Sequence, residues 1–381
     1  MDLRARLFVP AVIILALCAA CACAEPPGFA RDFTYKQRDG AVDIIKGKTV
    51  VASYVYKDTP RPYIYPLLSP AGVQVTRNYP MKTVEGEPTD HPHHRSMWIG
   101  FGDINGTDFW AEGEKSGKIV QTSIDFKPVT VGPYWAIHTT NDWLTHDGKK
   151  MCTDERYTAF YSCDYGTLIV TIVKIIASED PIKFNDTKEG FAAIRLAPSL
   201  ALKGGTGHIL NSEGDKDADA WGKRAKWVDY TGQIDGKTVG VTMFDAHTNY
   251  GYPTYWHARD YGLLAANPFG AKAFTGDATK ESPLSVKLGD SVVFRYVTLI
   301  HDGALDATTL DALAEDVAGS PKKPYDPTAA QKKDDAATQG SQLELAPKIV
   351  KPAQPKPGVN RAEPKGKTTP AKPPSDQSTD K

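Results

Sequence analysis

The chain has little cysteine, almost no net charge, and no hydrophobic run of membrane-spanning length after its N-terminus. Five of its 381 residues are cysteine, and the formal net charge at pH 7 is −1. A membrane helix needs roughly 20 apolar residues in a row, and no segment after residue 24 approaches that length. Apart from its basic ends the chain is acidic, which argues against nucleic-acid binding. Strand patterns also do not alternate with long helices, so an α/β fold is not expected.

The N-terminus has the pattern of an export signal. Arg4 and Arg6 precede an apolar run over residues 7–20, and a stretch of small residues suited to cleavage follows. This arrangement predicts a signal peptide over residues 1–24 and a periplasmic or secreted protein. Cysteines within the same segment lie in imperfect lipid-attachment contexts, so a lipoprotein anchor is the alternative.

Cys152 and Cys163 are the two cysteines left after the signal is removed. An exported protein meets an oxidising compartment, where a disulfide is the usual state of a cysteine pair. Residues 151–162, however, have the pattern of one strand, which would place the two thiols on opposite faces and roughly 35 Å apart. Bridged α-carbons lie roughly 4.4–6.8 Å apart. We therefore predict two unpaired cysteines.

Residues 321–381 are rich in Pro, Lys, Ala, Thr, Gln and Ser and contain almost no aromatic side chains. This composition predicts a disordered, extended tail that cannot bury a core. The tail holds twelve Lys and Arg against seven Asp and Glu, so it is basic. Envelope contact through anionic polymers and a role as a solvated spacer are both open. The folded body is expected over residues 29–320, as a single domain.

Apolar and polar residues alternate with a period of two through most of this body. The clearest runs are rich in Val, Ile, Thr, Tyr and Phe, and turn pairs such as Asp147-Gly148 separate them. These runs cover residues 49–56, 119–126, 134–140, 167–176, 238–244 and 291–299. They predict an all-β fold, built as a large antiparallel β-sandwich.

One helix is expected near the end of the body. Asp306 or Thr308 is suited to cap its N-terminus. Four apolar residues at helical spacing then share one face: Leu305, Leu310, Leu313 and Val317. The sandwich is therefore expected to end in a short C-terminal helix that precedes the tail.

Three of the nine histidines and an arginine lie within residues 90–98, Asp-His-Pro-His-His-Arg-Ser-Met-Trp. Histidine can donate a proton, accept one or bind a metal near neutral pH, so its clustering beside Asp90 and Arg95 indicates a polar site. His93 and His94 are the candidate acids in this first patch. In the alternative interpretation, Asp90 and the proline set a solvated turn and the imidazoles only hydrogen-bond locally.

A second dense patch covers residues 255–262, Tyr-Trp-His-Ala-Arg-Asp-Tyr-Gly. In an extended segment His257, Arg259 and Tyr261 face one way, and the residues between them face the other. One face would then carry a polar site and the other would be core. The alternative is a structural ion pair between Arg259 and Asp260 beside a core histidine. The distance between the two patches decides between these interpretations.

Residues 211–230 mix acids, bases and two tryptophans. This composition indicates a long loop of the kind that covers a pocket. Its Asp-x-Asp-x-Asp run lacks the glycine and distal glutamate of a helix–loop–helix calcium site, so we interpret it as solvated acidity.

Four stretches of the sequence together resemble one bacterial family. They are residues 66–72 (Pro-Leu-Leu-Ser-Pro-Ala-Gly), the first patch, residues 102–110 (Gly-Asp-Ile-Asn-Gly-Thr-Asp-Phe-Trp) and residues 256–270. They are similar to the "methane oxygenase PmoA" family, a domain of unknown function, over nearly all of the folded body. The resemblance implies a β-sandwich related to the galactose-mutarotase-like supersandwich, in exported proteins that handle carbohydrate. The family pattern has Gly where this chain has Ser96. Methane monooxygenase activity is not expected, because the chain has no membrane-spanning segment.

A carbohydrate site would give these residues recognisable roles. Aromatic rings stack on the apolar face of a sugar, while Arg, Asn, Asp and His bond its hydroxyls. The candidates for substrate binding are Arg95, Trp98, Asn105, Trp110, Tyr255, Trp256 and Arg259. In a mutarotase-like mechanism a carboxylate removes a hydroxyl proton while a protonated histidine donates one to the ring oxygen. The catalytic candidates are His93, His94 and His257 as acids and Asp103 or Asp260 as the base.

Three alternatives stay open at this point. Epimerase, lyase or hydrolase chemistry would need the same kinds of groups. A non-catalytic sugar-binding envelope protein would need only a stacking platform. A divalent-metal enzyme would use His91 and His93, which share a strand face, with His257 as the third ligand. No other cofactor is expected, and the partner is a carbohydrate or another small molecule.

Overall fold

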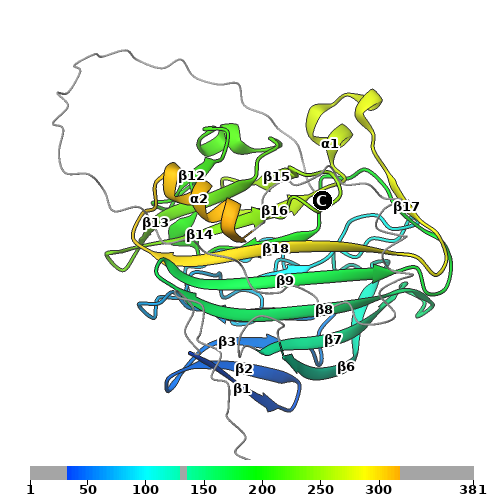
Figure 1. Cartoon of the computed structure of the whole chain (residues 1–381), viewed down its shortest axis with the longest axis horizontal. Helices are drawn as coiled ribbons and strands as arrows, with labels where there is room; N and C mark the ends of the chain where they lie inside the picture. Colours follow the sequence, from blue (N-terminus) through cyan, green and yellow to red (C-terminus); the bar gives the residue numbers. More distant parts are fainter. Residues whose placement is uncertain (1–31, 129–134, 318–381) are drawn as a thin grey trace, which may run out of the picture. The chain divides into compact units, whose positions relative to one another are not determined.

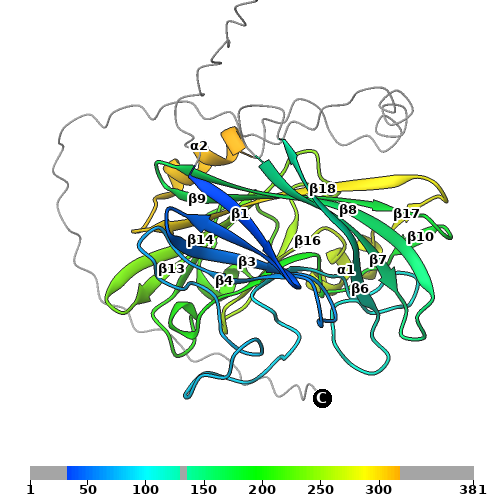
Figure 2. The same cartoon turned by 90° about the horizontal axis from the view of Figure 1, so that it is seen from below.

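The computed structural model describes residues 32–128 and 135–317 of the chain. These residues form two large antiparallel β-sheets that pack face to face, a two-stranded sheet and two short α-helices (Figures 1 and 2). The predicted all-β sandwich is confirmed. The predicted signal peptide over residues 1–24 and the predicted tail over residues 321–381 lie outside the described residues. Within the described part, no helix is long and apolar enough to cross a membrane.

Sheet 1 has eight strands, and its second half is assembled from segments that lie far apart in the sequence. The short strand β5 pairs with β11, which in turn pairs with β16. The strands in spatial order are β1 (Phe33–Arg38), β2 (Ala41–Lys46), β3 (Thr49–Val55), β4 (Tyr63–Leu67), β5 (Met97–Ile99), β11 (Ala192–Arg195), β16 (Leu263–Asn267) and β15 (Tyr255–Ala258). This order places the first patch, which runs into β5, and the second patch, which begins with β15, in the same half of one sheet, with β11 and β16 between them.

Sheet 2 also has eight strands, most of them long (Figure 1). In spatial order they are β12 (His208–Asn211), β13 (Trp227–Ile234), β14 (Lys237–Asp245), β18 (Ser291–Asp302), β9 (Gly166–Ile176), β8 (Lys150–Cys163), β7 (Trp135–Leu144) and β6 (Lys118–Pro128). All six runs with the clearest period of two are strands, one in sheet 1 and five here. A small separate sheet pairs β10 (Ile182–Phe184) with β17 (Leu284–Val286).

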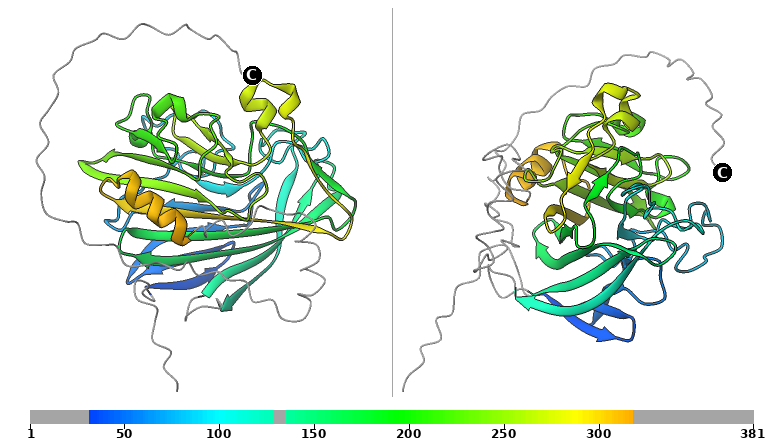
Figure 3. Two further views of the ribbon diagram at one scale, coloured as in Figure 1. Left: turned by 45° about the horizontal axis from the view of Figure 1, so that its top comes forward. Right: turned by 90° about the vertical axis from the view of Figure 1, so that its right-hand side faces the viewer.

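The predicted C-terminal helix is confirmed as α2 (Ala307–Val317). Asp306 caps it, because its carboxylate accepts a hydrogen bond from the Thr309 amide at 2.7 Å. The apolar face of the helix packs on the outer face of sheet 2 beside Trp227 (Figure 3). The other helices are α1 (Ala271–Thr275) and the 3₁₀ turns η1 (Pro198–Leu200), η2 (Asp217–Ala220) and η3 (Ala278–Lys280).

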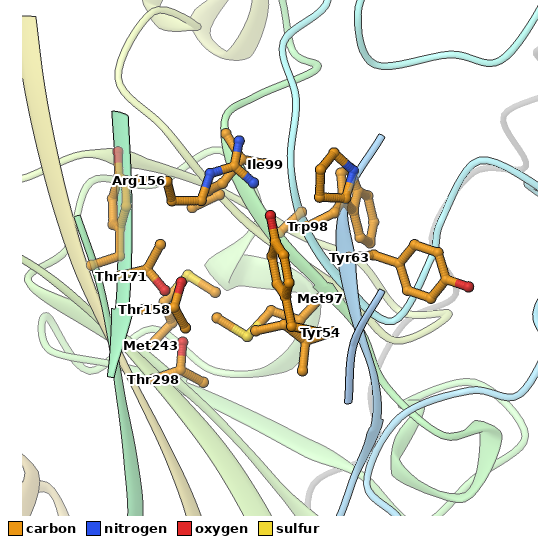
Figure 4. A pocket seen from close by; sticks show the side chains of 15 residues that line it. Tyr54, Tyr63, Met97, Trp98, Ile99, Arg156, Thr158, Thr171, Met243 and Thr298 are labelled. Atoms are coloured by element: carbon orange, nitrogen blue, oxygen red, sulfur yellow. The ribbon is translucent and has the colours of Figure 1, made fainter. Parts of the chain in front are cut away.

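The space between the sheets is an apolar core that contains a small cavity (Figure 4). Thr171 and Thr298 of sheet 2 lie on one side of it, and Tyr54 and Met97 of sheet 1 on the other. Both threonine hydroxyls are buried and have no hydrogen-bond partner among the described residues. Every lining residue except Tyr63 is buried. The cavity is therefore an interior space, and the exposed polar site has to lie elsewhere.

Cys152 and Cys163 lie on the same strand, β8, as the sequence predicted. Both are free, and Cys152 is fully buried. Burial raises the pKa of the Cys152 thiol, which keeps the thiol protonated and unreactive.

Candidate functional site

The candidate site lies on the face of sheet 1 that is turned away from sheet 2. Side chains alternate between the two faces of a strand, so Met97 and Ile99 enter the core between the sheets while Trp98 points outward. The pairing register extends this outward row across the sheet. It runs Tyr63, Trp98, Ala193, Ala265 and His257 on five neighbouring strands. Both alanines are buried, in a cluster with Trp98 and Trp110 on this face.

Asp90 organises the loop that covers this row. Its carboxylate accepts a hydrogen bond from Arg77 at 2.7 Å and two from Arg195 at 3.1 and 3.2 Å. It also forms a short hydrogen bond with His91 Nδ1. That bond and the two guanidinium groups hold the pKa of Asp90 well below its usual range. Asp90 is therefore a carboxylate at any physiological pH, and it fixes the orientation of the His91 ring.

His91 is a partly exposed histidine of the first patch. Its side chain is 36 % exposed, and its backbone has a φ of +46°, in the left-handed region. Nδ1 donates to the Asp90 carboxylate, so Nε2 carries the free lone pair of a neutral ring. An imidazole oriented by a carboxylate in this way is suited to accept a proton.

His91 belongs to a group of nearly parallel rings. Its ring centroid lies 4.7 Å from that of His94 and 5.0 Å from that of Tyr261. His94 in turn stacks on Trp98 at 5.3 Å and accepts a hydrogen bond at Nδ1 from Arg195 at 3.0 Å. The buried rings of His94 and Trp98 thus hold the partly exposed ring of His91 in place.

The other histidines of the two patches are held neutral at neutral pH. Burial is the main cause, with nearby arginines adding to it: it lowers the pKa of His93 to about 4 and that of His257 to about 3. The pKa of His94 is also lowered by burial, with the neighbouring His93 as the next cause. The sequence interpretation of these three residues as protonated acids is therefore not favoured by their surroundings.

Tyr261 joins the two patches. Its ring stacks on His91, and the guanidinium groups of Arg195 and Arg259 lie 4.5 and 5.2 Å from its centroid. The alternation predicted for the second patch also holds, because Trp256 and Ala258 enter the core while His257 lies on the opposite face. The polar parts of the two patches thus meet on one face of the sheet.

His257 has an unusual environment at the edge of this face. Its Nδ1 donates to the Lys188 carbonyl at 3.0 Å, which leaves the lone pair on Nε2. Nε2 is buried and has no hydrogen-bond partner among the described residues. The ring lies 6.3 Å from that of Trp221, which comes from the loop predicted to cover a pocket. That loop therefore contributes a side chain at this edge.

Three predicted site residues lie away from this face or at its margin. Trp256 is fully buried in the core, where its Nε1 donates to the Ala225 carbonyl at 2.8 Å. Asp103 and Asn105 stabilise a turn: the Asp103 carboxylate accepts from the Gly106 amide, and Asn105 donates to the Pro181 carbonyl. None of the three is carried into the proposed site.

Arg95, Trp98 and Trp110 support the site from below. Arg95 makes two hydrogen bonds of 2.7 Å to Glu112, so its guanidinium is already paired. Trp98 and Trp110 are each 2 % exposed and pack against His94. A sugar cannot stack directly on a tryptophan that is this deeply buried.

Tyr255 and Asp260 lie at the margin of the site. Tyr255 is half-buried between Arg224, 5.6 Å from its ring, and Phe274, 5.7 Å from it. Asp260 forms no ion pair with Arg259 within the described residues. The predicted structural ion pair is therefore not formed, and Asp260 is not carried into the proposed site.

Sequence reasoning gave no role to Arg77, Arg195 or Glu189. Arg195 is a charged residue inside the apolar strand β11, a pattern that marks a buried and paired arginine. Glu189 follows Lys188, and burial raises its pKa, with His91 and Arg259 close enough for their charges to oppose that rise. Only the fold brings these residues to the first patch.

The predicted set of three histidine metal ligands is not formed. Among residues 32–128 and 135–317, no group of three or more His, Cys, Asp or Glu side chains is placed to hold a metal ion. His91 instead hydrogen-bonds Asp90, and His257 hydrogen-bonds a backbone carbonyl.

Ser96 has a backbone conformation that favours glycine. Its φ is +54°, a left-handed conformation that costs a residue with a side chain roughly 1–2 kcal/mol. We expect Ser96→Gly to exceed Ser96→Ala in unfolding free energy by about 1 kcal/mol, since both lose the hydroxyl but only glycine lacks the Cβ. Urea unfolding of the two variants measures this difference. Equal stabilities would show that the backbone conformation carries no cost.

Solved structures that match this chain have low sequence identity to it and low TM-scores. One of them is a glycoside hydrolase family 97 enzyme from Pseudoalteromonas sp. strain K8, with 12 % identity and a TM-score of 0.37. The match covers 67 % of this chain and 34 % of the enzyme chain. A galactose mutarotase-like protein from Clostridium acetobutylicum matches 72 % of this chain and 100 % of its own (11 % identity, TM-score 0.34). The chain thus spans about a third of the length of the glycoside hydrolase.

Sequence comparison identifies a family for this chain. No curated protein matches the chain. A family of unknown function, DUF6807, matches residues 41–315, which include every residue of the site described above. The chain belongs to this DUF6807 family.

Proposed function

We propose that this domain binds a carbohydrate on the outer face of sheet 1 and that His91 acts there as a general base. The observation that carries the proposal is the Asp90–His91 pair. A carboxylate fixed by Arg77 and Arg195 holds one imidazole nitrogen, and the ring is still 36 % exposed. An arrangement needed only for folding would not require a histidine that is both oriented and accessible.

The chemistry proposed for this pair is proton abstraction. His91 Nε2 takes a proton from a sugar hydroxyl or from a carbon beside a carbonyl, and the Asp90 carboxylate stabilises the imidazolium that forms. Epimerisation, lyase and mutarotase-like reactions share this first step, so the proposal stops at acid–base chemistry on a carbohydrate.

Binding is proposed to involve the half-buried ring of Tyr261 and the guanidinium of Arg259. A partly exposed aromatic ring with charged hydrogen-bond donors beside it is a common platform for sugar rings. A non-catalytic sugar-binding protein would use the same platform without proton transfer. It is the second candidate, favoured by the depressed pKa values of His93 and His257.

The cellular setting belongs to the proposal as well. The signal predicted over residues 1–24 and the basic tail support an exported protein of the cell envelope. The resemblance to the "methane oxygenase PmoA" family stays a prediction. It adds no oxygenase activity to the proposal.

The test compares His91→Asn with wild type. Asparagine tolerates the left-handed backbone at this position, so the variant removes the imidazole without straining the loop. Proton NMR of a panel of neutral and acidic sugars is expected to show turnover by wild type and a loss of at least about 100-fold in the variant. Isothermal titration should find sugar affinity changed only a few-fold.

His146→Asn is the matched control, because His146 is an exposed histidine on the turn between β7 and β8. It should leave turnover unchanged. Sugar binding with no turnover by wild type would favour the non-catalytic candidate. If His91→Asn retained full turnover, the role of His91 as the base would be ruled out.

A further inference from the structure

We infer that the carbohydrate bound at this site carries a carboxylate group and that Arg259 binds that group. This inference rests on the proposed function and adds the class of sugar. Arg259 is half-buried, and within the described residues its guanidinium makes no ion pair or hydrogen bond. It lies instead over two aromatic rings, 5.2 Å from the centroid of Tyr261 and 6.0 Å from that of Trp221.

The position of Arg259 is fixed although its charge is unpaired. Its amide donates to the Leu263 carbonyl at 2.8 Å, and its own carbonyl accepts from the Tyr230 hydroxyl at 3.0 Å. The two rings then restrict the side chain. A guanidinium held in this way loses little conformational freedom when a planar anion binds, and carboxylates match its fork of donors.

The neighbouring charges favour an anion. Two carboxylates, the partly exposed Asp90 and the nearly buried Glu112, are each shared by two arginines: Asp90 by Arg77 and Arg195, and Glu112 by Arg61 and Arg95. Each trio therefore carries one excess positive charge before Arg259 is added. Lys188 and Glu189 lie 3.9 Å apart and offset each other. Burial lowers the pKa of Arg77 and of Arg195, and the Asp90 carboxylate opposes that shift in both.

Two further polar atoms near Arg259 lack partners. Nε1 of Trp221 and Nε2 of His257 are both buried without a hydrogen bond among the described residues. The indole N–H is a donor, which suits a carboxylate oxygen. His257 Nε2 is an acceptor, because Nδ1 donates to the Lys188 carbonyl, and it suits a hydroxyl. Donors for an anion and an acceptor for a hydroxyl fit a sugar acid better than an inorganic anion or a neutral sugar.

The experiment measures binding to the exported chain by isothermal titration. The probes are trimers of galacturonic, glucuronic and mannuronic acid and the trimers of their neutral counterparts, galactose, glucose and mannose. At least one acidic trimer is expected to bind tenfold or more tightly than its neutral counterpart, since hydrogen bonds between charged groups are roughly twice as strong as those between neutral groups. Its affinity should fall as the salt concentration rises.

Arg259→Gln is expected to abolish this preference, and Arg259→Lys to retain part of it, because lysine keeps the charge without the fork of donors. Arg38→Gln is the matched control. It removes an exposed arginine of β1, at the opposite edge of sheet 1, and should leave the preference unchanged. Thermal unfolding of each variant establishes that it is folded.

The outcomes separate this inference from the proposed function. If neutral trimers bind as tightly as acidic ones, the carboxylate inference is overturned while the carbohydrate site stands. If the acidic preference survives in Arg259→Gln, the assignment to Arg259 is overturned. If wild type binds neither class, the proposed function itself fails.

Discussion

Trp256→Ala is expected to lower the free energy of unfolding by about 3–5 kcal/mol. Trp256 is 0 % exposed and packs in the core between the two sheets. Its replacement opens a large cavity and leaves the Ala225 carbonyl without the indole donor that lies 2.8 Å away. The expected loss is a large fraction of the stability of a typical domain. Urea unfolding followed by circular dichroism measures it.

Trp135→Ala provides the control for this prediction. Trp135 is 50 % exposed, so its removal should change stability by less than about 1 kcal/mol. Trp256→Phe keeps an aromatic ring in the core, so its loss of unfolding free energy should lie between the losses of Trp256→Ala and Trp135→Ala. This variant should remain folded for binding studies. Sugar affinity of that variant is expected to match wild type. A specific loss of affinity with normal stability would return Trp256 to the ligand site.

The two interpretations of Trp256 show what the sequence can and cannot predict. Residue type suggested a stacking platform for sugar, while the period of two placed Trp256 on the side of the strand opposite His257. The period was the better guide, because alternation in a strand is a geometric property of the backbone. The same rule predicted six strands, while the helical spacing of four apolar residues predicted the C-terminal helix, with Asp306 as one of its two candidate caps.

The partners in the site could not be predicted in this way. Arg195 reaches Asp90 across 105 positions of sequence, and only the order of strands in sheet 1 brings them together. The period of two shows which residues share a face of a strand, but it does not show which strands lie beside that strand in the sheet. Asp103 was a candidate base as a carboxylate of the stretch 102–110, one of the four that carry the resemblance. Its carboxylate instead holds a turn, since short polar side chains often bond nearby backbone amides.

His91 shows a second limit. The sequence assigned it only to an alternative metal site, whereas the fold makes it the exposed member of a carboxylate–histidine pair. Its left-handed backbone directs the ring toward Asp90 and Tyr261, and nothing in the residue pattern indicates that conformation. Non-glycine residues in this region often mark functional loops.

Asp90→Asn is expected to be the most damaging single change in the polar cluster. The substitution removes the charge that pairs with Arg77 and Arg195, whose side chains are 1 % and 3 % exposed. Breaking a buried ion pair costs about 3–5 kcal/mol, and the partial exposure of Asp90 itself places the expected loss near 2–3 kcal/mol. Urea unfolding at pH 7 measures this loss, and the same variant should lose turnover because His91 loses its orienting partner.

The pH dependence distinguishes a lost charge from a lost contact. The pKa of Asp90 in the folded state is held well below its usual range, chiefly by the hydrogen bond from His91 and then by the two arginines. A carboxylate with a depressed pKa stabilises the fold fully above the pKa of the unfolded chain, roughly 3.9. That stabilisation disappears as the pH falls from there through the lower folded-state pKa. The stability difference between wild type and Asp90→Asn should therefore be constant from pH 7 to about 4 and shrink below it.

Asp39→Asn separates this effect from the general loss of one acidic group. Asp39 is 85 % exposed and pairs with Lys57 on the surface, so its substitution should leave the unfolding midpoint unchanged at every pH. A wild-type advantage over Asp90→Asn that persists undiminished at pH 2.5 would mean that shape or packing, and not charge, is lost at position 90. The carboxylate would then not be what holds Arg77, Arg195 and His91 together, and the general-base proposal would lose its structural support.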